Sequence, residues 1–180
     1  KGGVDFPPIW HTKCSLLTEE KTLHKVLVSI TDELQSRKQI LRTAGVANID
    51  EYNRNAEKKL YRSVFACDEI AEVLDKTGLS KQQKDEILKI ESELSIIARQ
   101  GRAFGIHLVL ATQRPDAAIL NGQIRNNIDT RICGRADNVL SQIILDNTDA
   151  SDKIAKSSQG RFLTNSGKIF QAYWFDKNIL

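Results

Sequence analysis

The sequence lacks methionine altogether and is poor in the residues that interrupt or cross-link a chain. It has 3 prolines and 3 cysteines among 180 residues, and its first residue is Lys1. Because a newly made chain begins with methionine, we expect this one to be part of a longer protein. The cysteines are odd in number and widely spaced, which is unlike a disulfide framework or a zinc site. We therefore expect reduced thiols in a protein of the cytoplasm.

Long hydrophobic runs are also absent, since no stretch reaches the roughly 18 apolar residues of a membrane span. Hydrophobic residues make up 41% and charged residues 27% of the chain, as in an ordinary globular domain. The net charge of +3 permits a nucleic-acid partner without requiring one. No aromatic residue lies among the arginines of residues 121–135, so stacking on single-stranded bases is not indicated there.

Helical and strand-like periodicities alternate along the chain, which is typical of an α/β fold with a mostly parallel sheet. We expect a long helix with Thr18 as its N-cap and Gly45 as its C-cap. Short apolar runs predict strands, and the turn around Asn165 and Gly167 predicts a C-terminal β-hairpin. The expected strands cover residues 64–67, 105–111 and 128–133, and further helices are expected over 49–60, from 70, over 84–100 and over 138–145. Residues 1–17 are expected to be irregular and 76–85 to form an exposed loop.

Two of the predicted strands end in polar side chains. The run Val64–Cys67 is followed by Asp68 and Glu69, and the run Gly105–Thr112 is followed by Gln113. Ligands of open α/β sheets bind at this edge. One carboxylate can orient Mg²⁺ through a water, the other can polarise the water that attacks a γ-phosphate, and the amide can bond both. Taken alone, however, the acidic run is more typical of a strand that surfaces at an acidic turn.

Several arginines are candidates for contacts with phosphate groups. Arg102 and Arg114 flank the second strand and could face a nucleotide across a subunit boundary, as an arginine finger does. Arg114, Arg125, Arg131 and Arg135 are candidates for contacts with the phosphate backbone of DNA. The alternatives are a solvated helix end for Arg102, a surface salt bridge for Arg114 and scattered surface charge for the others.

The order of these motifs resembles the FtsK/SpoIIIE family of DNA-translocating ATPases. The resemblance covers nearly the whole chain and rests on residues 64–69, 101–115 and 122–132, with shorter matches at 44–46, 48–49, 52–53, 144–146 and 160–162. It implies a RecA-like P-loop NTPase core with a mostly parallel sheet and helices on both faces. This chain would be the C-terminal part of one motor domain, without the Walker A strand and helix.

The resemblance also implies roles for individual residues. By position, Asp68 and Glu69 match the Walker B pair, with Asp68 holding Mg²⁺, and Gln113 matches the sensor. Asp68 and Gln113 would thus contact the bound nucleotide. Arg102 matches the arginine finger, and Arg125 matches a basic residue of a pore loop. The implied cofactors are ATP and Mg²⁺, and the implied partners are double-stranded DNA and further copies of the protein in a hexameric ring. The parent protein would work in the cytoplasm, at the inner face of the bacterial cell membrane.

The chain departs from the family pattern at two features, one for binding ATP and one for gripping DNA. The Walker A pattern, Gly-x-x-x-x-Gly-Lys-Ser/Thr, is missing from the 180 residues, so we expect the chain alone to be inactive as an ATPase. Gln142 stands where family members often carry a basic residue.

Three uses of such a motor compete: chromosome segregation, conjugative DNA transfer and type VII protein secretion. Residues 118–123, 146–150 and 171–175 are most similar to coupling proteins of mobile elements. A non-hydrolysing module that only assembles or binds a partner is the remaining alternative, and the intact pair Asp68 and Glu69 argues against it.

Overall fold

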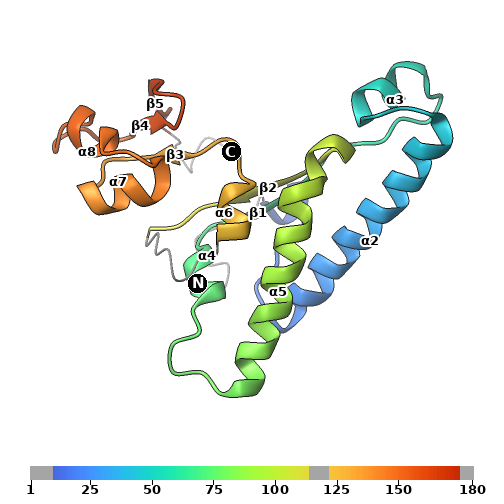
Figure 1. Cartoon of the computed structure of the whole chain (residues 1–180), viewed down its shortest axis with the longest axis horizontal. Helices are drawn as coiled ribbons and strands as arrows, with labels where there is room; N and C mark the ends of the chain where they lie inside the picture. Colours follow the sequence, from blue (N-terminus) through green and yellow to red (C-terminus); the bar gives the residue numbers. More distant parts are fainter. Residues whose placement is uncertain (1–9, 114–121, 175–180) are drawn as a thin grey trace. The chain divides into compact units, whose positions relative to one another are not determined.

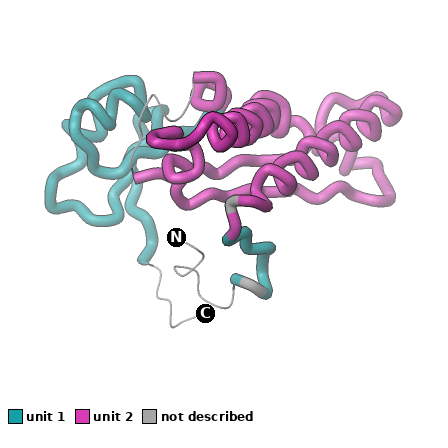
Figure 2. Tube along the Cα trace, turned by 90° about the horizontal axis from the view of Figure 1, so that it is seen from below, with its two compact units in different colours: residues 1–18, 115–117, 128–180 teal, residues 19–114, 118–127 magenta. Residues whose placement is uncertain are grey.

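The computed structural model of the chain describes residues 10–113 and 122–174. Two compact units are coloured separately in Figure 2. The magenta unit comprises residues 19–114 and 118–127, and we call it the helix unit. The teal unit comprises residues 1–18, 115–117 and 128–180, and we call it the hairpin unit. None of the described helices is long and apolar enough to cross a membrane.

The helix unit combines two long helices with a parallel pair of strands (Figure 1). Strands β1 and β2 pair with Ser63 opposite Ile106 and with Cys67 opposite Leu110. Because the strands are parallel and in register, their carboxyl ends lie at the same edge. The elements in chain order are α2 (Glu20–Ala44), α3 (Ile49–Asn55), β1 (Ser63–Cys67), α4 (Ile70–Leu74), α5 (Lys81–Gln100), the 3₁₀ helix η1 (Gly101–Phe104), β2 (Ile106–Leu110) and α6 (Gly122–Asn126).

The core of the helix unit forms where α2 packs against α5, and the two helices run side by side in Figure 1. Leu27, Leu34 and Leu41 recur every seven residues along α2 and are buried, as are Leu94 and Ile97 of α5. Burial of one such side chain stabilises the fold by about 1.5–3 kcal/mol. Strand β2 and helices α4 and α6 also contact α5. Helix α5 therefore supports β2, and β1 is held through its pairing with β2.

Local signals set the ends of the long helices. Gly45 adopts the left-handed conformation, with a φ of 66°, and is the C-cap of α2 as expected. The expectation that Thr18 caps α2 is wrong, because the N-cap is Glu19, whose side chain makes no capping hydrogen bond. Helix α5 begins inside the segment expected to be a loop, because Ser80 and Gln83 form a capping box there.

The hairpin unit contains a small antiparallel sheet in the order β3-β4-β5. The expected C-terminal hairpin is confirmed, and the rings of Phe162 and Phe170 stack across it with centroids 5.7 Å apart. A short helix, α1, lies in the segment expected to be irregular. The elements are α1 (Trp10–Lys13), β3 (Ile132–Cys133), α7 (Asn138–Leu145), α8 (Asp149–Lys153), β4 (Arg161–Thr164) and β5 (Ile169–Gln171), and the core consists of Cys133, Leu145, Ala150, Ile154 and Leu163.

The third expected strand, over 128–133, is shorter than expected and does not belong to the parallel sheet. Only Ile132–Cys133 is a strand, and it pairs antiparallel with β4. Asn165 in the hairpin turn fixes this pairing: its backbone N–H donates to the carbonyl of Arg131 at 2.9 Å, and its side-chain amide donates to the carbonyl of Asp129 at 2.9 Å. The expectation of one mostly parallel sheet is therefore correct only for β1 and β2 among the described residues.

Candidate functional site

The candidate site lies at the shared carboxyl edge of β1 and β2. Pairing between the two segments continues past the strands, because the N–H of Ala111 donates to the carbonyl of Cys67 at 2.9 Å. The N–H of Ile70 then donates to the carbonyl of Ala111, also at 2.9 Å. These bonds bring Asp68 and Glu69 beside the end of β2.

The carboxylate of Glu69 is held by donors from the end of β2. Its Oε1 accepts a hydrogen bond from the hydroxyl of Thr112 at 2.5 Å, and its Oε2 accepts one from the backbone N–H of Gln113 at 2.9 Å. Hydrogen bonds to a charged group are stronger than those between neutral groups, so this contact orients Glu69. The sequence predicted that Glu69 and Gln113 would lie at one edge, and the structure confirms it. The contribution of Thr112 was not predicted, although a hydroxyl directly before the expected sensor could have indicated it.

Asp68 and Glu69 differ in their surroundings. Asp68 is exposed, whereas Glu69 is half-buried and is the first residue before α4. Mg²⁺ prefers oxygen ligands and usually keeps several waters while bridging one or two carboxylates and substrate phosphates. The described residues contain no group of three or more His, Cys, Asp or Glu side chains that could enclose a metal by themselves. An exposed carboxylate at Asp68 fits a Mg²⁺ ion shared with a nucleotide, and does not fit a metal cage made of protein alone.

Cys67 ends β1 immediately before the acidic pair. Burial raises the pKa of its thiol, a hydrogen bond with the backbone of Glu69 lowers it by less than this, and the nearby carboxylates of Asp68, Glu69 and Glu72 raise it further. A thiol with a raised pKa remains protonated near neutral pH and is a poor nucleophile. Cys67 therefore serves as a packed apolar residue of β1.

Arg102 is not brought together with the acidic pair. It is exposed on η1, which precedes β2, whereas Glu69 contacts the segment that follows β2. The five residues of β2 separate these two edges by roughly 17 Å. Within one chain, Arg102 therefore lies at the amino end of β2, and Glu69 lies beside its carboxyl end.

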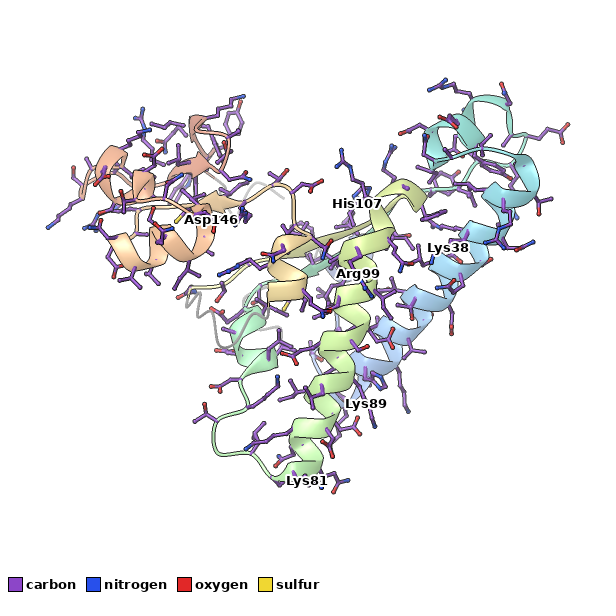
Figure 3. All side chains as sticks on the ribbon, in the orientation of Figure 1. Lys38, Lys81, Lys89, Arg99, His107 and Asp146 are labelled. Atoms are coloured by element: carbon purple, nitrogen blue, oxygen red, sulfur yellow. The ribbon has the colours of Figure 1, made fainter. Side chains whose placement is uncertain are left out.

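The other arginines have different environments. Arg125 is half-buried on α6, and Arg135 is exposed between β3 and α7. The guanidinium of Arg131 makes an ion pair with Asp146, whose carboxylate lies 2.7 Å away. Asp146, labelled in Figure 3, has a φ of 61° and is the C-cap of α7. Arg114 lies outside the described residues.

Comparison with known proteins indicates the relationship of this chain. DNA translocase FtsK of Chlamydia pneumoniae is 34% identical to it over 148 residues, which are 79% of this chain and 18% of that protein. The chain is a relative of FtsK. No protein-family model matches it. The chain spans about a fifth of the length of this FtsK protein, so the comparison concerns one portion of FtsK.

Solved structures extend the FtsK relationship. The pCW3 conjugation coupling protein TcpA, in its monomer form with ATPγS, superposes with a TM-score of 0.91 and 38% identity, over 99% of this chain and 51% of that one. The cytoplasmic domain of the type VII secretion ATPase EccC of Thermomonospora curvata superposes with a TM-score of 0.71 over 97% of this chain and 21% of that one. Its identity is 22%, so it shows a shared fold alone.

Proposed function

We propose that this chain is part of an FtsK-type motor that hydrolyses ATP to move double-stranded DNA. The observation that carries the proposal is the contact of Glu69 with Thr112 and the N–H of Gln113 at the shared edge of β1 and β2. The edge is where α/β enzymes bind ligands. The similarity to FtsK and to the coupling protein TcpA supports both the reaction and the DNA substrate. Conjugative transfer is the use that we favour, because TcpA matches over nearly the whole chain.

The residues at this edge divide the work of hydrolysis in our proposal. Asp68 would hold Mg²⁺, and the ion would neutralise part of the phosphate charge. Glu69 orients the attacking water and accepts its proton. The side-chain amide of Gln113 contacts the γ-phosphate and the same water. Thr112 keeps the Glu69 carboxylate in the orientation that this requires.

The remainder of the nucleotide site comes from outside these 180 residues in our proposal. A RecA-like core with helices on both faces needs a glycine-rich loop whose N–H groups cradle the phosphates, and the sequence has no such pattern. Two carboxylates facing an anion repel it unless Mg²⁺ intervenes. We therefore expect that the chain alone neither binds nor hydrolyses ATP, and calorimetry with Mg-ATP tests this.

We propose that the active assembly is a hexameric ring in the cytoplasm. The full-length protein holds this ring at the inner face of the cell membrane in our proposal. The position of Arg102, roughly 17 Å from the edge that carries Glu69, favours a role at the nucleotide of a neighbouring subunit. Arg114, Arg125 and Arg135 contact the DNA backbone in this account. Arg131 is a weaker candidate, because its guanidinium is engaged by Asp146.

A secretion ATPase is the second candidate, and the fold shared with EccC is compatible with it. ATP turnover by the full-length protein separates the two. We expect stimulation by duplex DNA of any sequence, with an affinity that falls steeply with salt because bound phosphates release counterions. Arg125→Ala should flatten the plot of log affinity against log salt by about 0.9 for each DNA phosphate that is no longer neutralised, whereas Arg54→Ala, on the exposed surface of α3, should not. Stimulation by a peptide but not by DNA would favour secretion, and no turnover with either would favour a non-hydrolysing module.

A further inference from the structure

Arg37 is a charged residue in the interior of the helix unit. It belongs to α2 and is only 5% exposed. An ionised group loses hydration when it is buried, so its retention requires compensating hydrogen bonds. The Nε of Arg37 donates to a carboxylate oxygen of Glu33 at 2.7 Å, one turn earlier on the same helix. The rest of the guanidinium faces a different part of the chain.

The other donors of Arg37 are aimed at the turn between η1 and β2. Its Nη1 donates to the carbonyl of Phe104 at 2.8 Å and, at 3.4 Å, to the carbonyl of Gly105. Its Nη2 donates to the hydroxyl of Ser63, the first residue of β1, at 3.2 Å. The planar fork of arginine can serve these acceptors together, which the compact ammonium group of lysine cannot. Arg37 therefore ties the turn to the start of both strands.

The same turn is confined on its other sides. Gly105 has a φ of 73°, and a Cβ built on it would meet the Ile49 side chain at 2.5 Å. The Gly105 N–H donates back to the carbonyl of Arg102 at 3.2 Å. Lys38, labelled on α2 in Figure 3, donates to the side chain of Gln100 and lies 6.0 Å from the centre of the Phe104 ring. The backbone that carries Arg102 is thus held by α2 and packed against α3.

We propose that Arg37 is a positioning residue for Arg102, and that it holds the turn on which Arg102 is presented to the nucleotide of the neighbouring subunit. This inference rests on the proposed function, in which Arg102 acts as a finger. A finger stabilises charge that develops in the transition state, and a misplacement of about 1 Å can lower the rate up to about a hundredfold. Loosening of the turn should therefore reduce kcat and leave the KM for ATP nearly unchanged, because binding depends on other groups.

A double-mutant cycle on ATP turnover by the full-length protein tests this role. The variants are Arg37→Lys, Arg102→Ala and their combination, with Arg42→Lys on the exposed face of α2 as the matched control. We expect Arg37→Lys to lower kcat about tenfold, with a KM change below about twofold, and the control to behave as wild type. The double variant should be no slower than Arg102→Ala, because both changes act through one group.

The outcomes separate this inference from the proposed function. Suppose that Arg102→Ala is slow. If Arg37→Lys then has no effect on kcat, lowers kcat by a further factor in the double variant, or changes KM instead of kcat, the positioning role is wrong and the finger role stands. If Arg102→Ala turns over normally, the finger and its positioning residue are both wrong. If Arg37→Lys fails to fold, Glu33→Ala replaces it in the cycle. Glu33 is half-exposed, and in the proposed role it acts on the turn through its ion pair with Arg37. Asp32→Ala, on the exposed side of α2, is then the control.

Discussion

Thr112 supplies a hydroxyl to the Glu69 carboxylate at 2.5 Å, so its removal should disturb the proposed base without touching it. Such a bond to a charged group contributes about 1.5–3 kcal/mol, and loss of about 1.4 kcal/mol of transition-state stabilisation is tenfold in rate. We expect Thr112→Val to lower ATP turnover of the full-length protein about tenfold or more. Thr112→Ser should retain most of the activity, because it keeps the hydroxyl.

The control for this comparison is Thr130→Val, which changes an exposed threonine in the same way. A serine variant as slow as the valine variant would mean that packing of the Thr112 methyl group, and not its hydrogen bond, is what matters.

At this scale, the sequence predicted which residues share an edge but not how they touch. Asp68, Glu69 and Gln113 were placed together because parallel strands end at one edge, and this depends only on strand order. The hydrogen bonds from Thr112 and from the backbone of Gln113 depend on side-chain rotamers and on the residue at which the strand ends. The periodicity of the sequence gives no information on either. The ion pair of Arg131 with Asp146 was missed for the same reason, since 15 positions separate the two residues in the sequence.

Among the elements, α5 has an N-terminus built by two residues. The Ser80 side chain accepts from the N–H of Gln83, and the Gln83 side chain accepts from the N–H of Ser80, which completes a capping box. We expect Ser80→Ala to lower the free energy of unfolding by about 1 kcal/mol, measured by chemical denaturation of the 180-residue chain. Ser92→Ala, at an exposed position inside the same helix, should leave stability unchanged or slightly raised, because alanine is the better helix former.

An equal loss in the Ser80 and Ser92 variants would show that the capping box contributes nothing specific.

The elements predicted best were those with sustained periodicity. The body of α2, both strands of the parallel pair and the hairpin follow from spacing and turn residues. The start of α5 was missed because residues 76–85 are polar, and the signal there is a reciprocal pair of hydrogen bonds instead of an apolar stripe. Strand β3 has only two residues, and its partner lies some thirty positions later, so tertiary contacts decided its pairing.

At the scale of the whole molecule, the division into two units was not predicted, because it depends on which distant segments share a core.

The proposed ring makes a prediction that a single chain cannot show. If Arg102 serves the site of a neighbour, then Arg102→Ala subunits doped into wild-type rings should lower ATP turnover by more than dilution does, because each one impairs an adjacent intact site.

In the doping experiment, Arg99→Ala is the matched control, since Arg99 is exposed on the last turn of α5. Activity that falls only in proportion to the fraction of Arg102→Ala subunits would contradict a site shared between subunits.

The central claim is that the edge of β1 and β2 carries the base of an ATP-driven motor. The most direct measurement is ATP binding and turnover by the full-length protein with Glu69→Gln, compared with Glu57→Gln at an exposed position outside the site. The amide keeps the shape of Glu69 but cannot accept the proton of the attacking water. We predict that turnover falls about 10²–10⁴-fold while nucleotide binding survives, and that the control is unaffected. Near-normal turnover in Glu69→Gln would contradict the account.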